Sequence, residues 1–136
     1  MTYKKQIRLG MVGGGIDANI GEAHRFAARL DNRYNLLAGS LSSTPERSKT
    51  SGQAIGLDPE RIYDNFTVMA EKESSRKDGI EAVAIVTPNN VHAESAIAFL
   101  KKGIHVICEK PLTATLDQAK DLAKVARESK ALFILT

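Results

Sequence analysis

The sequence predicts an α/β fold of the doubly wound kind, with a mostly parallel sheet between two layers of helices in an αβα arrangement. Short apolar runs alternate with longer segments of helical periodicity. Turn-forming residues close each apolar run before the next helix begins. With 136 residues, of which 43% are hydrophobic, the chain has the size of one domain with its own core. We therefore treat residues 1–136 as a single domain.

The first expected strand and helix flank a glycine-rich turn. Residues 7–12 are apolar nearly throughout, as expected for a strand that is covered on both faces. The helix is expected to begin at residue 19 or 20 and to end at residue 30. Its expected buried stripe has the spacing of one helical face and comprises Ile20, Ala23, Ala27 and Leu30.

The second expected strand spans residues 34–41. Thr44 is the expected N-cap of the helix that follows, because Pro45 suits the first helical position and an acidic residue comes next. That helix should end near residue 55, with Gly56 as its C-cap.

The middle of the chain contains two short elements before the clearest strand. Residues 61–63 are a candidate short strand, and Asn65 is the expected cap of a helix that ends near residue 73. The run AVAIV within residues 79–87 predicts a strand buried on both faces. A helix over residues 91–102 should follow it, closed by Gly103.

The last part of the chain repeats the pattern once more. Residues 104–108 form an apolar strand, and Thr115 with Gln118 forms a capping box for a helix that ends near residue 129. Residues 131–135 form the last strand. Since the chain stops directly after this apolar run, we expect it to be a fragment of a longer protein.

The composition favours a soluble cytoplasmic protein. The 19 basic and 16 acidic residues give a net charge of +3 without a dense basic block, so nothing supports a nucleic-acid partner. Cys108 is the single cysteine and lies in an apolar run, which is typical of a small buried side chain in a reducing compartment. No run approaches the roughly 20 apolar residues of a membrane helix, and the N-terminal apolar run is too short for a signal peptide.

The glycine turn is a candidate phosphate-binding loop. Gly13, Gly14 and Gly15 end the first strand and precede the first helix, where a dinucleotide pyrophosphate meets free backbone N–H groups. The third glycine position of the usual motif is filled either by Ala18 or, with three extra residues, by Gly21. The alternative is a flexible turn with no ligand.

The end of the second strand favours NADP over NAD. Ser42 and Ser43 stand where an acid would hold the ribose hydroxyls of NAD, and Arg47 follows on the next helix. Hydroxyl groups and a guanidinium can bind a 2′-phosphate, and no carboxylate is present there to repel it. The alternative is a serine-rich cap beside a solvated arginine.

Two further strand ends carry polar residues: the stretch TPNNVH at residues 87–92 and EKP at residues 109–111. Ligands of open α/β sheets lie beyond such ends. Lys110, fixed between an apolar strand and a proline, can stabilise negative charge on a substrate oxygen; the alternative is an ion pair with Glu109. His92 is equally compatible with a structural role, and His24 and His105 are expected to be packing residues. The residue spacings show no metal site.

These motifs together resemble the glucose–fructose oxidoreductase / inositol dehydrogenase / MocA (Gfo/Idh/MocA) family. They are VGGG at the end of the first strand, G-x-x-H-R at residues 21–25, TPN-x-x-H at residues 87–92 and EKP. The resemblance covers the whole chain. It implies an N-terminal Rossmann domain that binds NAD or NADP, followed in the full-length protein by an α+β substrate domain that is absent from this chain. It also implies hydride transfer to or from a hydroxyl carbon of a sugar, an inositol or a related small molecule.

The resemblance assigns roles to individual residues. Lys110 would be the catalytic residue, near both the nicotinamide and the reacting hydroxyl, with Glu109 orienting it and a cis bond between Lys110 and Pro111. Because His24 aligns with a helix histidine of the family, Gly21 rather than Ala18 would be the third glycine. The full cofactor-binding set would be Gly13, Gly14, Gly15, Ile16, Asn19, Ile20, Gly21, Ser42, Ser43, Arg47, Thr87, Pro88, Asn89, His92, Glu109, Lys110 and Pro111.

Two departures from the family pattern affect the expectations. The loop is lengthened over residues 16–20, so we expect Asn19 to cap the helix and residues 16–18 to fold over the pyrophosphate as a flap. The family's acid–base histidine and a nearby aspartate lie in the absent domain, so the fragment alone should bind cofactor without turnover.

Three further expectations concern partners and function class. The full-length protein should act on a small polyol or sugar and form a homo-oligomer, with no membrane partner. A non-catalytic NADP-binding regulator is the main alternative, although it would have no need for the lysine of EKP. An S-adenosylmethionine methyltransferase would require an acid near Ser42 and Ser43.

Overall fold

The computed structural model describes residues 5–136, and its centre is a five-stranded, fully parallel sheet. The strand order is β2-β1-β3-β4-β5. The strands are β1 (Ile7–Gly13), β2 (Tyr34–Ser40), β3 (Ala82–Val86), β4 (His105–Cys108) and β5 (Phe133–Leu135). The chain moves outward from β1 to β2 and then returns to β3 on the other side of β1. A crevice at the carboxyl ends of β1 and β3 is therefore expected to receive the ligand.

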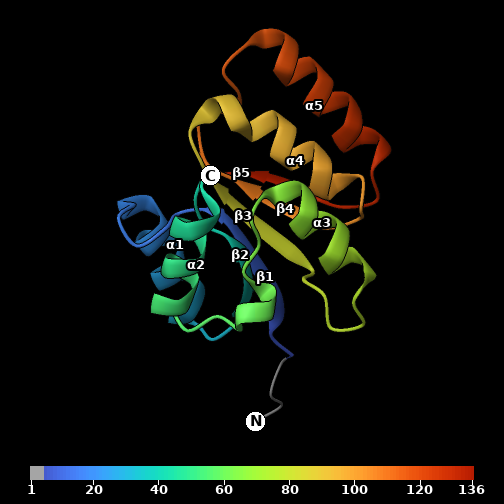
Figure 1. The fold of residues 1–136 in the computed structure, drawn as a ribbon. Helices are drawn as coiled ribbons and strands as arrows, with labels where there is room; N and C mark the ends of the chain where they lie inside the picture. The colour runs from blue at the N-terminus through green and yellow to red at the C-terminus, as the bar shows by residue number, and fades with distance from the viewer. Residues whose placement is uncertain (1–4) are drawn as a thin grey trace.

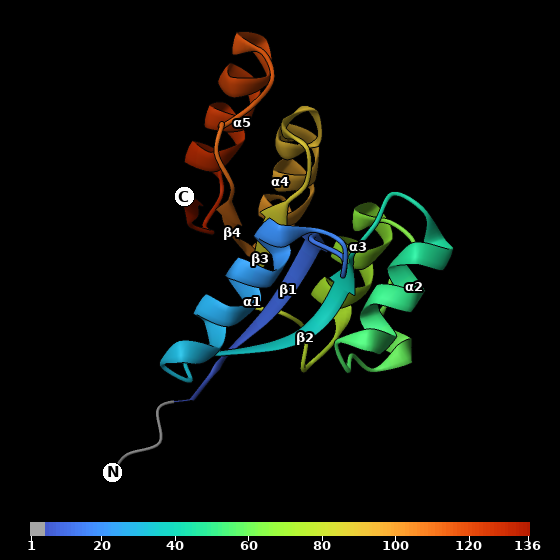
Figure 2. The same cartoon turned by 90° about the vertical axis from the view of Figure 1, so that its left-hand side faces the viewer.

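Five α-helices cover the two faces of this sheet. They are α1 (Asn19–Leu30), α2 (Pro45–Ala54), α3 (Phe66–Ser75), α4 (His92–Leu100) and α5 (Leu116–Glu128), with short 3₁₀ turns η1 (Pro59–Arg61) and η2 (Asn89–Val91). In Figure 1, α1 and α2 lie on one side of the strands, and α3, α4 and α5 lie on the other. Figure 2 shows α1 in front of β1. The predicted doubly wound, three-layer Rossmann fold is confirmed.

Two hydrophobic clusters form the core, one on each face. The larger joins β3 and β4 to the helices α3, α4 and α5, and it includes Val83, Phe99 and Val106. The smaller lies on the other face of the sheet and joins Leu9 and Met11 of β1 to Leu41 and Leu57. Every residue of β3 is buried, as the run AVAIV predicted. Cys108 is also buried in the larger cluster, as expected.

Most of the predicted helix boundaries are confirmed. The Asn65 side chain accepts from the Val68 N–H at the start of α3, and Thr115 forms the predicted capping box with Gln118. Gly56 and Gly103 follow α2 and α4 with positive φ angles. Thr44 is the N-cap of α2, although its side chain makes no capping hydrogen bond.

The predicted orientation of α1 is wrong. Its apolar stripe faces solvent, and Ile20, Phe26 and Leu30 are exposed. The inward face instead carries Gly21 and Arg25, because the start of the helix packs against the glycine loop and Arg25 donates to the Gly14 carbonyl. These two contacts fix the rotation of the helix more strongly than its hydrophobic pattern does.

The candidate strand at residues 61–63 is reduced to a single bridge. Ile62 forms a parallel bridge with Gly39 of β2, and the Tyr63 N–H donates to the Gly39 carbonyl at 2.8 Å. A buried ion pair between Arg61 and Glu73, 2.5 Å apart, anchors the segment to α3. The following residues 64–66 are thereby placed at the carboxyl edge of the sheet.

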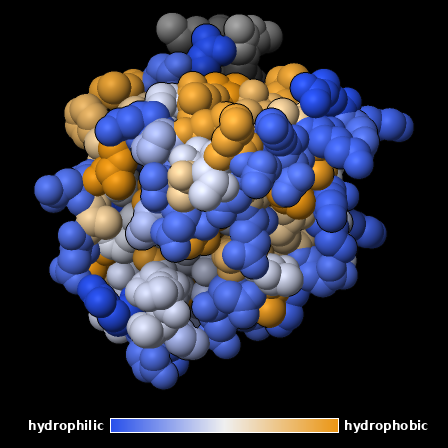
Figure 3. All heavy atoms as spheres, turned by 90° about the horizontal axis from the view of Figure 1, so that it is seen from above, coloured by the Kyte–Doolittle hydropathy of each residue, from blue (hydrophilic) through white to orange (hydrophobic). Residues whose placement is uncertain are grey.

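Hydrophobic side chains also reach the surface. Figure 3 shows them in connected areas on the upper face of the molecule, between hydrophilic ones. Within residues 5–136 no helix combines the length and the apolar character needed to cross a membrane. Residues 1–4, which belong to the segment judged too short for a signal peptide, lie outside the described residues.

Candidate functional site

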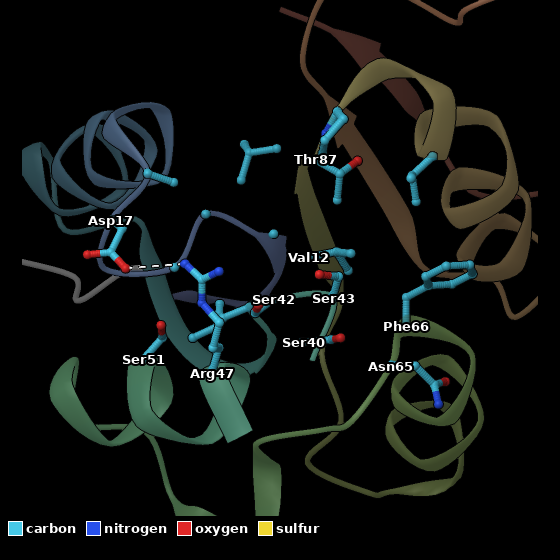
Figure 4. Close-up of a pocket in the computed structure, with 18 of the residues that line it drawn as sticks. Val12, Asp17, Ser40, Ser42, Ser43, Arg47, Ser51, Asn65, Phe66 and Thr87 are labelled. Carbon is cyan, nitrogen blue, oxygen red and sulfur yellow. Dashed lines mark hydrogen bonds and ion pairs between the residues drawn. The ribbon is translucent and has the colours of Figure 1, made fainter. Parts of the chain in front are cut away.

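A cavity of about 550 Å³ opens at the carboxyl edge of the sheet. One wall is the glycine loop with the end of β1, and a second is the end of β2 with the first turns of α2. The third wall combines residues 64–66 with the end of β3 and the segment that follows it. Figure 4 shows polar side chains from these walls around the cavity.

The glycine wall is formed by close backbone contact. Gly13 and Gly14 have φ angles of 76° and 68°, a left-handed conformation that favours glycine. A Cβ atom on Gly14 would lie 2.9 Å from the Cα atom of Gly21, and one on Gly21 would overlap the backbone of Gly14. Gly21, and not Ala18, is therefore the residue at which helix and loop approach each other.

The N-terminus of α1 reaches this wall without a side-chain cap. Ala18 is the N-cap residue and makes no capping hydrogen bond with its side chain, and Asn19 is already the first helical residue. The prediction that Asn19 caps the helix is wrong, because the helix begins one residue earlier than a cap at that position would require. The first N–H groups of a helix have no partners within the helix, so they are available to an anion.

Thr87 supplies a second group that can bind a ligand. Its hydroxyl oxygen is buried and has no hydrogen-bond partner among the described residues. The residue lies directly after β3 and lines the cavity. Because buried polar atoms nearly always have a partner, an unpaired hydroxyl in a cavity wall points to a ligand that completes it.

His92 lies behind this wall. It is buried, its Nδ1 is 2.8 Å from the Pro111 carbonyl oxygen, and its Nε2 is 2.9 Å from the Thr87 carbonyl oxygen. The imidazole thus connects the segment after β3 to the segment after β4.

Glu109 is held by groups other than the Lys110 ammonium. Its carboxylate lies 2.9 Å from His24 Nε2 and accepts from the Lys110 backbone N–H at 3.1 Å and from the Thr136 hydroxyl at 3.3 Å. The hydrogen bond from His24 is the main reason that the pKa of Glu109 lies below its usual range. Lys110 is exposed, and no ion pair among residues 5–136 involves it. The Lys110–Pro111 bond is cis, as the resemblance implied.

The wall at β2 and α2 carries the predicted ribose-binding residues. Ser42, Ser43 and Arg47 line the cavity. Arg47 also pairs with Asp17 from the lengthened loop, with Nη2 and Oδ2 3.4 Å apart. Ser51, one turn further along α2, accepts from the Ile16 N–H at 3.3 Å.

The predicted site residues fall into two groups. Those that line the cavity are Gly13, Gly14, Gly15, Ile16, Ser42, Ser43, Arg47, Thr87 and Pro88. Those outside the lining are Asn19, Ile20, Gly21, Asn89, His92, Glu109, Lys110 and Pro111. His24, expected to be a packing residue, is a hydrogen-bond partner of Glu109, and the exposed His105 accepts from the Leu132 N–H.

Sequence reasoning missed the wall formed by residues 64–66. Asp64, Asn65 and Phe66 line the cavity, as do Asn90 and Val91 beyond β3. The signal was present, because a candidate strand followed by a helix cap at Asn65 places a turn at the same sheet edge. The prediction recognised both elements without treating their junction as part of a site.

Comparison with known proteins gives one family and many similar proteins. The model of the Gfo/Idh/MocA family, described as "Oxidoreductase family, NAD-binding Rossmann fold", matches residues 7–136. The uncharacterized oxidoreductase YfiI of Bacillus subtilis (strain 168) is 42% identical over 125 residues, which is 91% of this chain and 32% of YfiI.

Two solved structures have the same fold. An oxidoreductase from Sinorhizobium meliloti superimposes with a TM-score of 0.94 at 62% identity, over 98% of this chain and 37% of the other. An inositol dehydrogenase homolog from Azotobacter vinelandii, complexed with NADH and myo-inositol, superimposes with a TM-score of 0.92 at 40% identity, over 97% and 35%. The chain thus spans about a third of the length of these relatives.

Proposed function

The chain belongs to the Gfo/Idh/MocA oxidoreductase family, and from that premise we propose that it is the NAD(P)-binding domain of a dehydrogenase for sugars, inositols or related polyols. The proposal rests above all on the contact between Gly14 and Gly21. This contact places an uncapped helix N-terminus at the wall of a cavity of about 550 Å³. The likeness to an inositol dehydrogenase homolog complexed with NADH and myo-inositol supports the same reading.

The residues around the cavity fit a dinucleotide in three parts. Gly13 to Gly15 and the start of α1 would hold the pyrophosphate through backbone N–H groups. The serine hydroxyls of residues 42–43 and the Arg47 guanidinium would hold the adenosine ribose. The Thr87 hydroxyl, buried and unpaired among the described residues, would form a hydrogen bond with the cofactor near its nicotinamide ribose.

Lys110 is the residue of this chain that would act on the substrate. A bound nicotinamide cofactor supplies the hydride exchange. The Lys110 ammonium would donate a hydrogen bond to the reacting oxygen and stabilise negative charge there. Its backbone is fixed by Glu109, while its side chain is exposed and can reach a substrate. We place the base that takes the hydroxyl proton in the part of the full-length protein beyond this chain.

For the cofactor we propose a modest preference for NADP. The end of β2 carries Ser42 and Ser43 in place of an acid, and Arg47 lies beside them in the cavity wall. A guanidinium binds phosphate well, since it is cationic and presents several donors in one plane. The same argument allows NAD to bind, because serine hydroxyls can also hydrogen-bond ribose.

Binding titrations test the proposal directly. The purified chain should bind NADPH and NADH, measured by calorimetry, and should not bind S-adenosylmethionine. Binding of S-adenosylmethionine alone would refute the dehydrogenase assignment. In the full-length protein, turnover of polyols should depend on added cofactor, which a non-catalytic regulator would not show.

Thr87→Val offers a sharper test of where the cofactor lies. Valine keeps the shape of threonine and removes the unpaired hydroxyl, so the free protein should keep its stability to within about 1 kcal/mol. Cofactor affinity should fall by roughly tenfold, because one hydrogen bond to the ligand is lost. Thr113→Val is the control away from the cavity, at a threonine whose hydroxyl already donates to the Thr115 carbonyl. Equal cofactor affinity in both variants would remove Thr87 from the site.

A further inference from the structure

The lengthened glycine loop touches the helix that carries Arg47. Asp17 is one of the extra residues, and its carboxylate oxygen Oδ2 lies 3.4 Å from Arg47 Nη2. Figure 4 shows the two side chains pointing toward each other from separate elements at the cavity. Both residues line the cavity, so the contact lies within the proposed binding site.

A second contact attaches the loop to α2. The Ile16 N–H donates to Ser51 Oγ at 3.3 Å, and a Cβ atom on Gly15 would lie 2.8 Å from the same oxygen. Arg47 and Ser51 are four residues apart and therefore occupy one face of α2. Residues 15–17 thus lie along this face and are held at two points, one of them charged.

The Asp17–Arg47 pair is poorly suited to stabilising the fold. The two side chains are 80% and 69% exposed, and ion pairs so accessible to water contribute little. Their importance lies in the charge balance of the cavity. Among the described residues, Arg47 is the one cationic side chain in the lining, whereas Asp17 and Asp64 are both acidic.

Asp17 also supplies a group that the end of β2 lacks. In many dinucleotide-binding domains an acid at that strand end accepts the ribose hydroxyls, and here the strand is followed by Ser42 and Ser43. The lengthened loop brings a carboxylate to the same ribose-binding region from a different element.

We propose that Asp17 is a specificity-determining residue, which competes with the 2′-phosphate of the dinucleotide for Arg47; this inference rests on the proposed function. When the ribose carries a 2′-hydroxyl, the pair remains closed over the ligand and the carboxylate can accept a hydrogen bond. When the ribose carries a 2′-phosphate, Arg47 must turn from Asp17, and the carboxylate then lies beside a second anion. Asp17 therefore limits the preference for NADP that Arg47 creates.

The test measures binding of two ligands that lack nicotinamide, so it does not depend on hydride transfer. Calorimetry on the full chain compares ADP-ribose with 2′-phospho-ADP-ribose. Asp17→Asn should increase the affinity for the phosphorylated ligand, relative to the other, by about tenfold, because a nearby negative charge is removed. Arg47→Gln should weaken binding of the phosphorylated ligand selectively. In the double variant the effect of Asp17→Asn should be smaller, because the competition for Arg47 is gone and only the direct repulsion between carboxylate and phosphate remains.

Asp31→Asn is the matched control, since it removes the same charge at the far end of α1. It should leave the ratio of the two affinities unchanged. If both ligands bind and Asp17→Asn leaves the ratio unchanged, or changes it no more than Asp31→Asn, the inference is wrong while the proposed function stands. If neither ligand binds the unaltered chain, the proposed function itself fails.

Discussion

The two sides of the cavity are held in place by different means. On the glycine-loop side, backbone packs directly on backbone where Gly14 meets Gly21, and Arg25 donates to the Gly14 carbonyl. On the side of β3 and β4, the Glu109 N–H donates to the Ile85 carbonyl, and a side chain makes a further connection between the segments that follow the two strands. There His92 bridges the Thr87 and Pro111 carbonyl oxygens.

This difference separates two kinds of motif residue. Gly13 and Gly14 line the cavity, and because they have no side chain they can adopt the positive φ angles of the loop. His92 belongs to the TPN-x-x-H motif and Glu109 to the EKP motif, yet both lie outside the cavity lining. They position the segments that carry Thr87 and Lys110. A motif residue can therefore shape the cavity without lining it.

Replacing Gly21 by valine should have the largest effect on stability, because it disrupts the glycine-loop side of the cavity, which depends on backbone contact. The new side chain would overlap the Gly14 backbone, which cannot move without displacing the loop. We expect a loss of about 3 kcal/mol in the free energy of unfolding, at the upper end for overpacking. Urea denaturation measures it, and calorimetry should show no cofactor binding.

The control for this variant is Ala23→Val on the exposed face of the same helix. It tests the helix propensity of valine alone, which should cost less than about 1 kcal/mol. Similar losses in the two variants would show that the loop and the helix are not in tight contact at Gly21.

His92→Phe should have the next largest effect, on the side that depends on side-chain bridges. Phenylalanine fills the buried space but removes the two ring nitrogens that lie within hydrogen-bond distance of the Thr87 and Pro111 carbonyl oxygens. The loss of stability should be about 2 kcal/mol, with weaker cofactor binding because the Thr87 segment is no longer anchored. Thermal unfolding and calorimetry give the two values.

The exposed His105, whose ring accepts one N–H from Leu132, provides the comparison for His92. His105→Phe removes one accessible hydrogen bond and should have less than half the effect. If the two variants unfold at the same temperature, the bridge at His92 does not hold the two segments.

The sequence was sufficient to predict the sheet, the two layers of helices and most helix ends. Those predictions depend on local signals, such as the Asn65 cap and the capping box at Thr115. The rotation of α1 could not be predicted in this way. Its hydrophobic stripe suggested one buried face, but contacts between the helix and the glycine loop, at Arg25 and Gly14, selected another.

The candidate site was predictable to a similar extent. The cavity is lined by the predicted residues 13–15, Ser42, Ser43, Arg47 and Thr87, as a strand-end argument suggests. The partner of Arg47 could not be foreseen, because Asp17 is 30 residues away and nothing in the spacing links a loop acid to a helix arginine. The same holds for His24 and Glu109, which are 85 residues apart. Such pairs depend on tertiary structure alone.

Glu109→Gln should have the smallest effect at neutral pH, and its main effect should be on the pH dependence of stability. The pKa of Glu109 is held below its usual range, first by the hydrogen bond from His24 and also by the Thr136 hydroxyl and the Lys110 N–H. The stability that the carboxylate contributes is therefore fully present above the pKa of an unfolded glutamate, about 4.3. It is lost as the pH falls through the lower pKa of the folded state.

Glutamine has no charge to lose, so the variant should lose less stability than the unaltered chain between neutral pH and pH values below about 4. At pH 7 the substitution itself should cost about 1 kcal/mol, since the hydrogen bonds to His24, Lys110 and Thr136 lose their charged acceptor. Urea denaturation across this pH range measures both quantities, with Glu94→Gln as the control at an exposed position of α4. Parallel profiles for the unaltered chain and Glu109→Gln would mean that the carboxylate is as well stabilised in the unfolded chain. Lys110 would then be positioned by the backbone of the EKP segment, which the Glu109 N–H joins to the Ile85 carbonyl at 2.9 Å, and not by the Glu109 carboxylate.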